Sequence, residues 1–459
     1  RNHVAGCVLG LAQNSRLACG HLRADVFSVN PLIHLIREAS LFSHAKLTLF
    51  GYNPGGCAIG TRPVDLHLQG FKQLGADVRV CAETDTIVMT TAKQLTGAGD
   101  IHFRFPSVGA THSVMCAASL AIGVTTIHGA AAEPEVTDLA AMLNKCGARI
   151  TGAGTSTIRI EGVSGTCRSD TPSQGQQSLG VERTLRAETL SRTSMSQTSQ
   201  TSSQSVNKLL YGQTVMKHVS VIPDLASLLG CHHRAIPDRV EAGTLLVAAA
   251  VTLSSISVTP VVLAHLKSTM QVLESSGCTF SSEPLCETGK GFQGDDRLAR
   301  LTIYPPKVVL KSVTFATAPF PGIPTDMQPQ LCVLCAVAAG VSVVTETVFE
   351  NRFGHVKELG LMSAVFGEDE EFGGYENDDA DDTDKKNAKR SIRGSNGAPL
   401  TPRDVTGQDL RATAALVLAG LVCGDHDVTN VYGVTHLDRG YEQLDAKLNA
   451  LGARITRRG

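Results

Sequence analysis

The 459-residue sequence contains no tryptophan, and aromatic residues make up only 4% of it. Its hydrophobic cores must therefore be built mainly from aliphatic side chains and alanine. No apolar run reaches the roughly 18 residues that a membrane-spanning helix needs, and the longest candidates, such as 245–253, have the length of core helices. The formal net charge is only −2. Bulk charge thus gives no reason to expect nucleic acid or an anionic membrane as a partner.

The 13 cysteines are an odd number, and their spacing matches neither a disulfide framework nor a zinc site. This pattern favours a reducing compartment. Cys332 and Cys335 form a CxxC motif inside an apolar run, which predicts two buried thiols on a core helix rather than a redox pair. Cys231, His232 and His233 have no partner group at ligand spacing, so we expect no metal site there.

Two stretches differ from the rest in composition. Residues 191–205 are almost entirely Ser, Thr and Gln, which predicts a disordered insertion over about 167–222 because so few apolar side chains cannot offset the entropy of ordering. The stretch 368–384 holds ten carboxylates. We expect it to be a solvated part of a surface loop insertion spanning 366–400.

The remaining sequence repeats a unit of a small-residue apolar helix, a β-branched strand, an amphipathic helix and a Gly-led strand. Copies cover 113–151 and 245–280, and others start at Cys332 and Ala414. This pattern predicts an α/β fold with alanine-rich helices inside and half-buried sheets outside. The insertion separates two similar domains, at 1–166 and 223–459, and the cleft between them is the expected ligand site.

Chemistry-bearing residues concentrate in a few places. The glycine-rich segment 53–70 exposes Cys57 and carries Arg62. It is either an ordinary glycine loop or a lid whose reactive thiol and arginine close over an anion. Arg411 and Arg439 stand where helices are expected to begin, as solvated ends or as anion-binding groups. Asp326 follows a proline at a predicted helix start, as an N-cap or as a proton acceptor.

Several segments resemble the UDP-N-acetylglucosamine 1-carboxyvinyltransferase (MurA) family of enolpyruvyl transferases. They include PGGCAIGTRPVDLH, SVGAT, AAEPEVTDLA, PTDMQ, TETVFENRFGHV, DLRATAALVLAG and HLDRGYEQLDAKLNALGA. The resemblance implies a two-domain inverse α/β barrel of repeated βαβαββ units. It also implies enolpyruvyl transfer from phosphoenolpyruvate to the 3-hydroxyl of UDP-N-acetylglucosamine with release of phosphate, the first committed step of peptidoglycan precursor synthesis. No cofactor is expected, the expected location is the cytoplasm (or a plastid in a eukaryote), and fosfomycin is the family's known inhibitor.

The resemblance also assigns roles. Cys57 matches the family's acid, whose thiol can form a covalent adduct with the donor, and Asp326 matches the group that receives the hydroxyl proton. The positions that match donor-binding arginines are Arg62, Arg411 and Arg439. The positions that match nucleotide-sugar contacts are Arg37, Arg62, Pro63, Val64, Asp65, Leu66, Ser107, Val108, Asp326 and Val348.

Two departures from the family pattern leave alternatives open. Phe105 stands where the family usually has a lysine, and the adjacent Arg104 is a candidate substitute, although arginine and lysine are not interchangeable at such sites. The chain begins at Arg1, without the family's N-terminal Lys-Asn repeat, so we expect it to be incomplete at this end. The alternatives are an enolpyruvyl transferase of the shikimate branch and a non-catalytic relative that binds nucleotide sugar.

Overall fold

The structure is a computed structural model. It describes residues 47–52, 64–81, 86–91, 95–162, 228, 231–285, 297–349, 351–367, 388–424 and 428–458. The predicted insertion 167–222 and the acidic stretch 368–384 lie outside these residues. The surface loop expected over 366–400 is wrong for its C-terminal part, because Ala388–Arg393 is a strand paired on both sides within a sheet.

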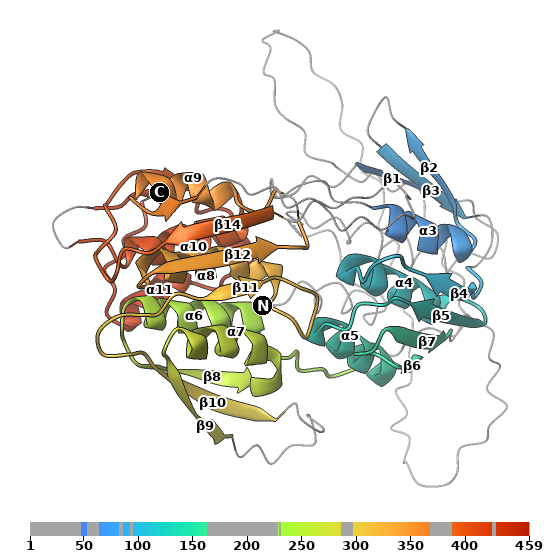
Figure 1. Ribbon diagram of the computed structural model, residues 1–459. Helices are drawn as coiled ribbons and strands as arrows, with labels where there is room; N and C mark the ends of the chain where they lie inside the picture. Colours follow the sequence, from blue (N-terminus) through green and yellow to red (C-terminus); the bar gives the residue numbers. More distant parts are fainter. Residues whose placement is uncertain are drawn as a thin grey trace, which may run out of the picture.

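The first half of the described chain has two sheets with helices packed beside them (Figure 1). One antiparallel sheet has the order β1-β3-β2, with β1 at Leu47–Tyr52, β2 at Asp77–Cys81 and β3 at Thr86–Thr91. The other has the order β4-β5-β7-β6, with β4 at Gly99–His102, β5 at Val124–His128, β6 at Arg149–Thr151 and β7 at Thr157–Glu161. Only the β4–β5 pair of that sheet is parallel. The helices are α3 at Asp65–Gln73, α4 at Val108–Leu120 and α5 at Pro134–Lys145.

The second half continues the same alternation. Its first sheet is antiparallel with the order β8-β10-β9, made of β8 at Ile256–Val262, β9 at Thr279–Pro284 and β10 at Leu298–Tyr304. The next has the order β11-β12-β14-β13, made of β11 at Thr314–Ala316, β12 at Val341–Glu346, β13 at Val365–Phe366 and β14 at Ala388–Arg393. A parallel pair joins β15 at Val405–Thr406 to β16 at Val431–Tyr432.

The helices of this half are α6 at Arg239–Val251, α7 at Leu263–Ser275, α8 at Gln328–Val337, α9 at Gly354–Leu361, α10 at Leu410–Gly420 and α11 at Leu444–Ala450. Two 3-10 turns, η1 at Thr325–Met327 and η2 at Leu437–Arg439, precede α8 and α11.

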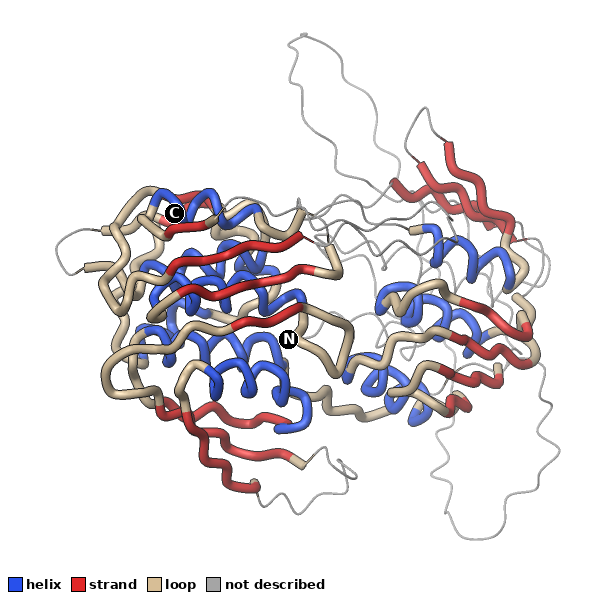
Figure 2. Tube along the Cα trace, in the orientation of Figure 1, coloured by secondary structure: helices blue, strands red, loops and turns tan. Residues whose placement is uncertain are grey.

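The helices α4, α6, α8 and α10 are buried along most of their circumference, because alanine and other small side chains let neighbouring helices approach closely. The strands instead alternate between buried and more exposed residues, as in β12. In Figure 2 the sheets accordingly lie outside the helices. The mixed α/β class predicted from the repeats is confirmed. Cys332 and Cys335 are both buried on α8, so the prediction of two buried thiols on a core helix is confirmed as well. Burial raises the pKa of Cys335 to about 12.

The buried apolar side chains form two separate clusters, one drawn from residues 66–160 together with Leu228 and one from residues 240–448. Polar contacts join the segments around them. Arg239, the first residue of α6, donates from Nε to Glu135 Oε1 at 2.9 Å, and the backbone N–H of Phe320 donates to Glu133 Oε1 at 3.3 Å. His233 lies 2.8 Å from Asp138, a partner that the sequence spacing did not reveal. Among the described residues, no helix has the length and apolar character needed to cross a membrane.

Candidate functional site

Asp326 lies at the centre of the clearest polar cluster in the second half. It is the middle residue of η1, two residues after Pro324 and two residues before the first residue of α8. Its carboxylate makes no capping bond to either element. The N-cap interpretation of Asp326 is therefore wrong, because the side chain points to two arginines instead.

Arg352 and Arg411 hold the two carboxylate oxygens of Asp326. Arg352 donates from Nη2 to Oδ1 at 2.8 Å, and Arg411 donates from Nε and Nη2 to Oδ2 at 3.1 and 3.0 Å. The side chains of Arg352 and Arg411 are only 3% and 13% exposed, whereas that of Asp326 is 39% exposed. The carboxylate is therefore the part of this cluster that an incoming molecule can reach.

The electrostatics of the cluster keep all three groups charged. Burial by itself would raise the pKa of Asp326, but Arg411 and Arg352 outweigh it and hold that pKa well below its usual range. Burial likewise works against the charge of Arg411, but Asp326 and Tyr441 raise the pKa of this guanidinium above its ordinary value. Asp326 is therefore a firmly ionised, weakly basic carboxylate as long as both arginines contact it.

Arg411 is positioned by the first turn of α10. Its backbone N–H donates to Oδ1 of Asp409 at 2.8 Å, and Ala412 donates to the same oxygen. Its guanidinium lies over the ring of Tyr441, 5.3 Å from the centroid. A carboxylate thus already occupies this helix N-terminus, so the guanidinium, not the backbone, is the group that can hold an anion. This corrects the sequence argument for Arg411.

Arg439 also differs from the expectation of a helix N-terminus. It ends the 3-10 turn η2, whereas α11 begins only at Leu444. It lies two residues before Tyr441, whose ring contacts Arg411. The backbone therefore brings Arg439 to the neighbourhood of Arg411 through the η2 turn and not through a helix dipole.

Sequence reasoning missed Glu346 as well as Arg352. Glu346 is the last residue of β12 and is only 1% exposed. Its carboxylate accepts from the hydroxyl of Thr325 at 2.9 Å and from the backbone N–H of Val348 at 2.8 Å. It thus ties the residue before Asp326 to Val348. Glu346 and Arg352 both belong to the segment 345–353, TETVFENRF. A glutamate at the end of a strand was the feature that could have drawn attention to this segment.

A second group gathers in the first half, where α3 and α4 begin side by side. Asp65 opens α3, and its Oδ2 lies 2.7 Å from Nη1 of Arg104. Arg104 in turn lies over the ring of Phe105, 5.3 Å from its centroid. Ser107 caps α4 by accepting from the N–H of Ala110 at 3.3 Å. Arg104 therefore places its charge beside the α3 residue that the sequence assigned to nucleotide-sugar binding.

The remaining residues of this predicted contact set are placed as follows. Val64 precedes α3, and Val108 opens α4, so both stand at the same pair of helix starts. Leu66 is 2% exposed and belongs to the first core, so only its backbone is available to a ligand. Four predicted site residues lie outside the described part of the chain: Arg37, Cys57, Arg62 and Pro63.

The cluster of Asp326, Arg352 and Arg411 in the second half combines an accessible carboxylate with two guanidinium groups that bind it directly. Arginine offers forked donors that match carboxylate and phosphate oxygens. An anionic ligand that drew Arg411 away from Asp326 would remove one of the two charges that depress the pKa of this carboxylate. Such an anion would therefore raise the pKa of Asp326.

The chain is similar to known proteins over most of its length. The family model described as EPSP synthase (3-phosphoshikimate 1-carboxyvinyltransferase) matches residues 20–171 and 211–448. UDP-N-acetylglucosamine 1-carboxyvinyltransferase 1 of Caldanaerobacter subterraneus subsp. tengcongensis is 37% identical over 438 residues, 95% of this chain and 78% of the relative. The corresponding protein of Prochlorococcus marinus is 38% identical over 95% of this chain and 75% of its own length.

Solved structures share the fold at lower identity. The enolpyruvyl transferase NikO from Streptomyces tendae superposes with a TM-score of 0.60 at 22% identity, covering 94% of this chain and 79% of that one. An EPSP synthase from Acinetobacter baumannii superposes with a TM-score of 0.55 at 15% identity, covering 93% of this chain and 78% of that one.

Proposed function

Because the chain belongs to the enolpyruvyl transferase family, in its UDP-N-acetylglucosamine 1-carboxyvinyltransferase branch, we propose that it transfers the enolpyruvyl group of phosphoenolpyruvate to the 3-hydroxyl of UDP-N-acetylglucosamine. The overall change replaces the bond between the enol carbon and the phosphate oxygen with a bond from the same carbon to the sugar oxygen. The products are the enol ether of the nucleotide sugar and inorganic phosphate. This reaction supplies a precursor of peptidoglycan.

The observation that carries the proposal is the accessible Asp326 carboxylate between Arg352 and Arg411. The sugar hydroxyl must lose a proton as its oxygen attacks the enol carbon, and a carboxylate within hydrogen-bond reach is a suitable acceptor. The methylene carbon of the donor gains a proton at the same time and becomes a methyl group. It loses one proton again when the phosphate leaves and the double bond of the enol ether forms. We assign the protonation to Cys57 from its sequence motif, because this residue lies outside the described part of the chain.

The donor is a compact multiple anion, so its binding requires guanidinium groups. We assign its carboxylate and phosphate to Arg411 and Arg439 in the second half, together with Arg62. When the donor accepts hydrogen bonds from Arg411, the positive charge of Arg411 acts less strongly on Asp326. The pKa of Asp326 then rises, because this charge is one of the two that lower it. Donor binding therefore prepares Asp326 to accept the hydroxyl proton, and the weakly basic ion pair represents the state before the donor arrives.

We assign the nucleotide sugar to the first-half group and to the Asp326 side of the second half. The adjacent starts of α3 and α4, with Asp65, Ser107 and Val108, support one end of this contact. Val348 supports the other end of the contact, because Glu346 binds both the backbone N–H of Val348 and the hydroxyl of Thr325, the residue before Asp326. Arg37, Arg62, Pro63, Val64 and Leu66 complete the proposed contact set.

The organisation of the chain follows from the same proposal. We infer two enolpyruvyl transferase domains, at 1–166 and 223–459, each an inverse α/β barrel, joined by the 167–222 insertion. Two separate apolar cores and fully buried inner helices support this division. The lack of a disulfide among the described cysteines supports a reducing location such as the cytoplasm.

The test is phosphate release from phosphoenolpyruvate in the presence of either UDP-N-acetylglucosamine or shikimate 3-phosphate. We expect release only with the nucleotide sugar, together with a product whose mass includes the enolpyruvyl group. Release with shikimate 3-phosphate instead would assign the chain to the other branch. Thermal stabilisation by UDP-N-acetylglucosamine without any release would make the protein a binding protein and not an enzyme.

A further inference from the structure

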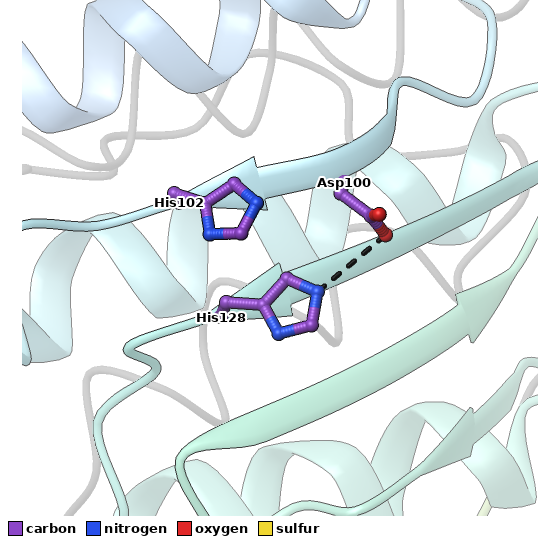
Figure 3. Close-up of side chains that lie close together, drawn as sticks. All are labelled: Asp100, His102 and His128. Carbon is purple, nitrogen blue, oxygen red and sulfur yellow. Dashed lines mark ion pairs between the residues drawn. The ribbon is translucent and has the colours of Figure 1, made fainter.

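Asp100, His102 and His128 gather on one exposed face of the β4-β5-β7-β6 sheet (Figure 3). Asp100 and His102 are two residues apart on β4, so their side chains point to the same face. The parallel register pairs His102 with His128 on β5 and therefore places the second histidine directly beside the first. The backbone thus fixes all three residues on one small patch.

The side-chain geometry of this patch fits a metal ion. One ligand atom from each residue can be chosen so that all three lie within 4.8 Å of one another. Nε2 of His128 lies 3.5 Å from Oδ1 of Asp100. Zinc–nitrogen and zinc–oxygen bonds of about 2.0–2.2 Å at a tetrahedral angle separate two ligand atoms by roughly 3.4 Å. The Asp100–His128 pair therefore already has the separation that a shared ion would impose.

His102 needs only a small side-chain adjustment to join them. Its ring is stacked on that of His128 with centroids 4.6 Å apart and planes inclined by 12°. Because the three ligand atoms already lie within 4.8 Å of one another, a shared ion requires them to approach only to roughly 3.4 Å. Both histidines stand on the outer, solvent-facing side of the sheet. Asp100, whose side chain is 64% exposed, can follow.

We propose that Asp100, His102 and His128 form a binding site for a divalent transition-metal ion of the zinc class. Two imidazoles and one carboxylate suit zinc, nickel or copper better than calcium or magnesium, which prefer oxygen ligands only. Three protein ligands leave at least one coordination position for water. The site clamps β4 to β5 across their parallel pairing and is separate from Asp326, Arg352 and Arg411, so the transferase reaction does not depend on it.

The experiment is isothermal titration of the full-length chain with zinc chloride, on wild type and on His102→Ala and His128→Ala variants. Zinc also binds thiols and other histidines, so the decisive quantity is the difference between variants. We expect each variant to lose one equivalent of zinc or to bind it at least about tenfold more weakly, since losing even an outer partner of a ligand costs that much. Zinc should also raise the Tm of wild type more than that of either variant, because the metal binds only the folded arrangement.

His232→Ala is the matched control, because His232 is also an exposed histidine but belongs to no such cluster among the described residues. It should bind zinc as wild type does. Metal-free variants should have unchanged Tm values and unchanged phosphate release. Unaltered zinc binding by both His102→Ala and His128→Ala, or an equal loss in His232→Ala, would overturn the assignment.

Discussion

Asp326 is the residue on which charge, position and accessibility converge. Two arginines from distant parts of the chain hold it, yet its own side chain remains 39% exposed. An ion pair of this kind is weak evidence for stability, because desolvating the charges costs free energy that their attraction only partly returns. We therefore attribute the arrangement to chemistry and test it there.

Asp326→Asn should lower turnover by about a hundredfold to ten-thousandfold, the usual cost of losing a general base. An amide still accepts a hydrogen bond from the sugar hydroxyl but takes up its proton poorly, so affinity for UDP-N-acetylglucosamine should change little. Steady-state phosphate release and nucleotide-sugar binding measure the two effects separately.

The matched control is Asp77→Asn, an exposed aspartate that also pairs with an arginine, Arg79. It should leave both quantities unchanged. An Asp326→Asn enzyme with an unaltered maximal rate would reduce this carboxylate to a partner of the buried Arg352. A matching fall in the Tm would indicate that lost folding, and not lost proton transfer, explains a lower rate.

Side chains from α6, from α8 and from the segment between η2 and α11 meet at one buried hydrogen-bond network behind Arg411. The hydroxyl of Tyr441, which lies between η2 and α11, is 2.9 Å from Oγ1 of Thr244 on α6 and 3.1 Å from Nε2 of Gln330 on α8. Tyr441 is 3% exposed, and its ring faces the guanidinium of Arg411. The network therefore joins α6 to α8, which follows Asp326, and holds the ring of Tyr441 against Arg411 on α10.

Tyr441→Phe should lower the free energy of unfolding by about 1 kcal/mol, the typical contribution of a buried hydrogen bond. The loss is limited because Gln330 Nε2 still donates to Thr244 Oγ1 at 3.0 Å. Guanidinium chloride unfolding measures it. Tyr432→Phe removes a hydroxyl from a tyrosine that is 53% exposed and should have almost no effect. Equal losses in the two variants would mean that the network does not stabilise the packing of these helices.

Each half of the protein carries a histidine that the fold holds in its neutral form. Burial lowers the pKa of His112 on α4 and of His355 on α9 to about 4. In the unfolded chain both titrate near 6.5. The unfolded state therefore takes up protons as the pH falls below about 6.5, whereas the folded state does not until about pH 4.

The contribution of these histidines to stability is thus fully present above their unfolded pKa and is lost as the pH falls toward their folded pKa. As the pH falls from 7 to 5, we expect the protonation of each histidine in the unfolded state to lower the free energy of unfolding by about 1–2 kcal/mol. His112→Gln and His355→Gln should each flatten the fall, as measured by chemical denaturation at both pH values. A fall of the same steepness in wild type and both variants would contradict the assignment to these groups.

Much of the fold and part of the site could be predicted from local patterns. Alternation and helical periodicity are properties of adjacent residues, so the alanine-rich inner helices, the β-branched strands and the buried pair Cys332 and Cys335 follow from the sequence. Asp326 and Arg411 also stood out, because each follows a recognisable helix-start motif. Their surroundings did not follow, as the rejected N-cap role of Asp326 illustrates.

The sequence alone therefore determined the element types, the repeat and the residue types available for anion binding and proton transfer. Only the tertiary structure decided which of them meet, because contact depends on the path of the chain between them. It joined Asp326 to Arg411 across 85 residues, and it added Arg352, which no spacing rule singled out. It also set His102 beside His128 through the register of two parallel strands, since neighbours across a sheet are chosen by strand pairing and not by distance along the sequence.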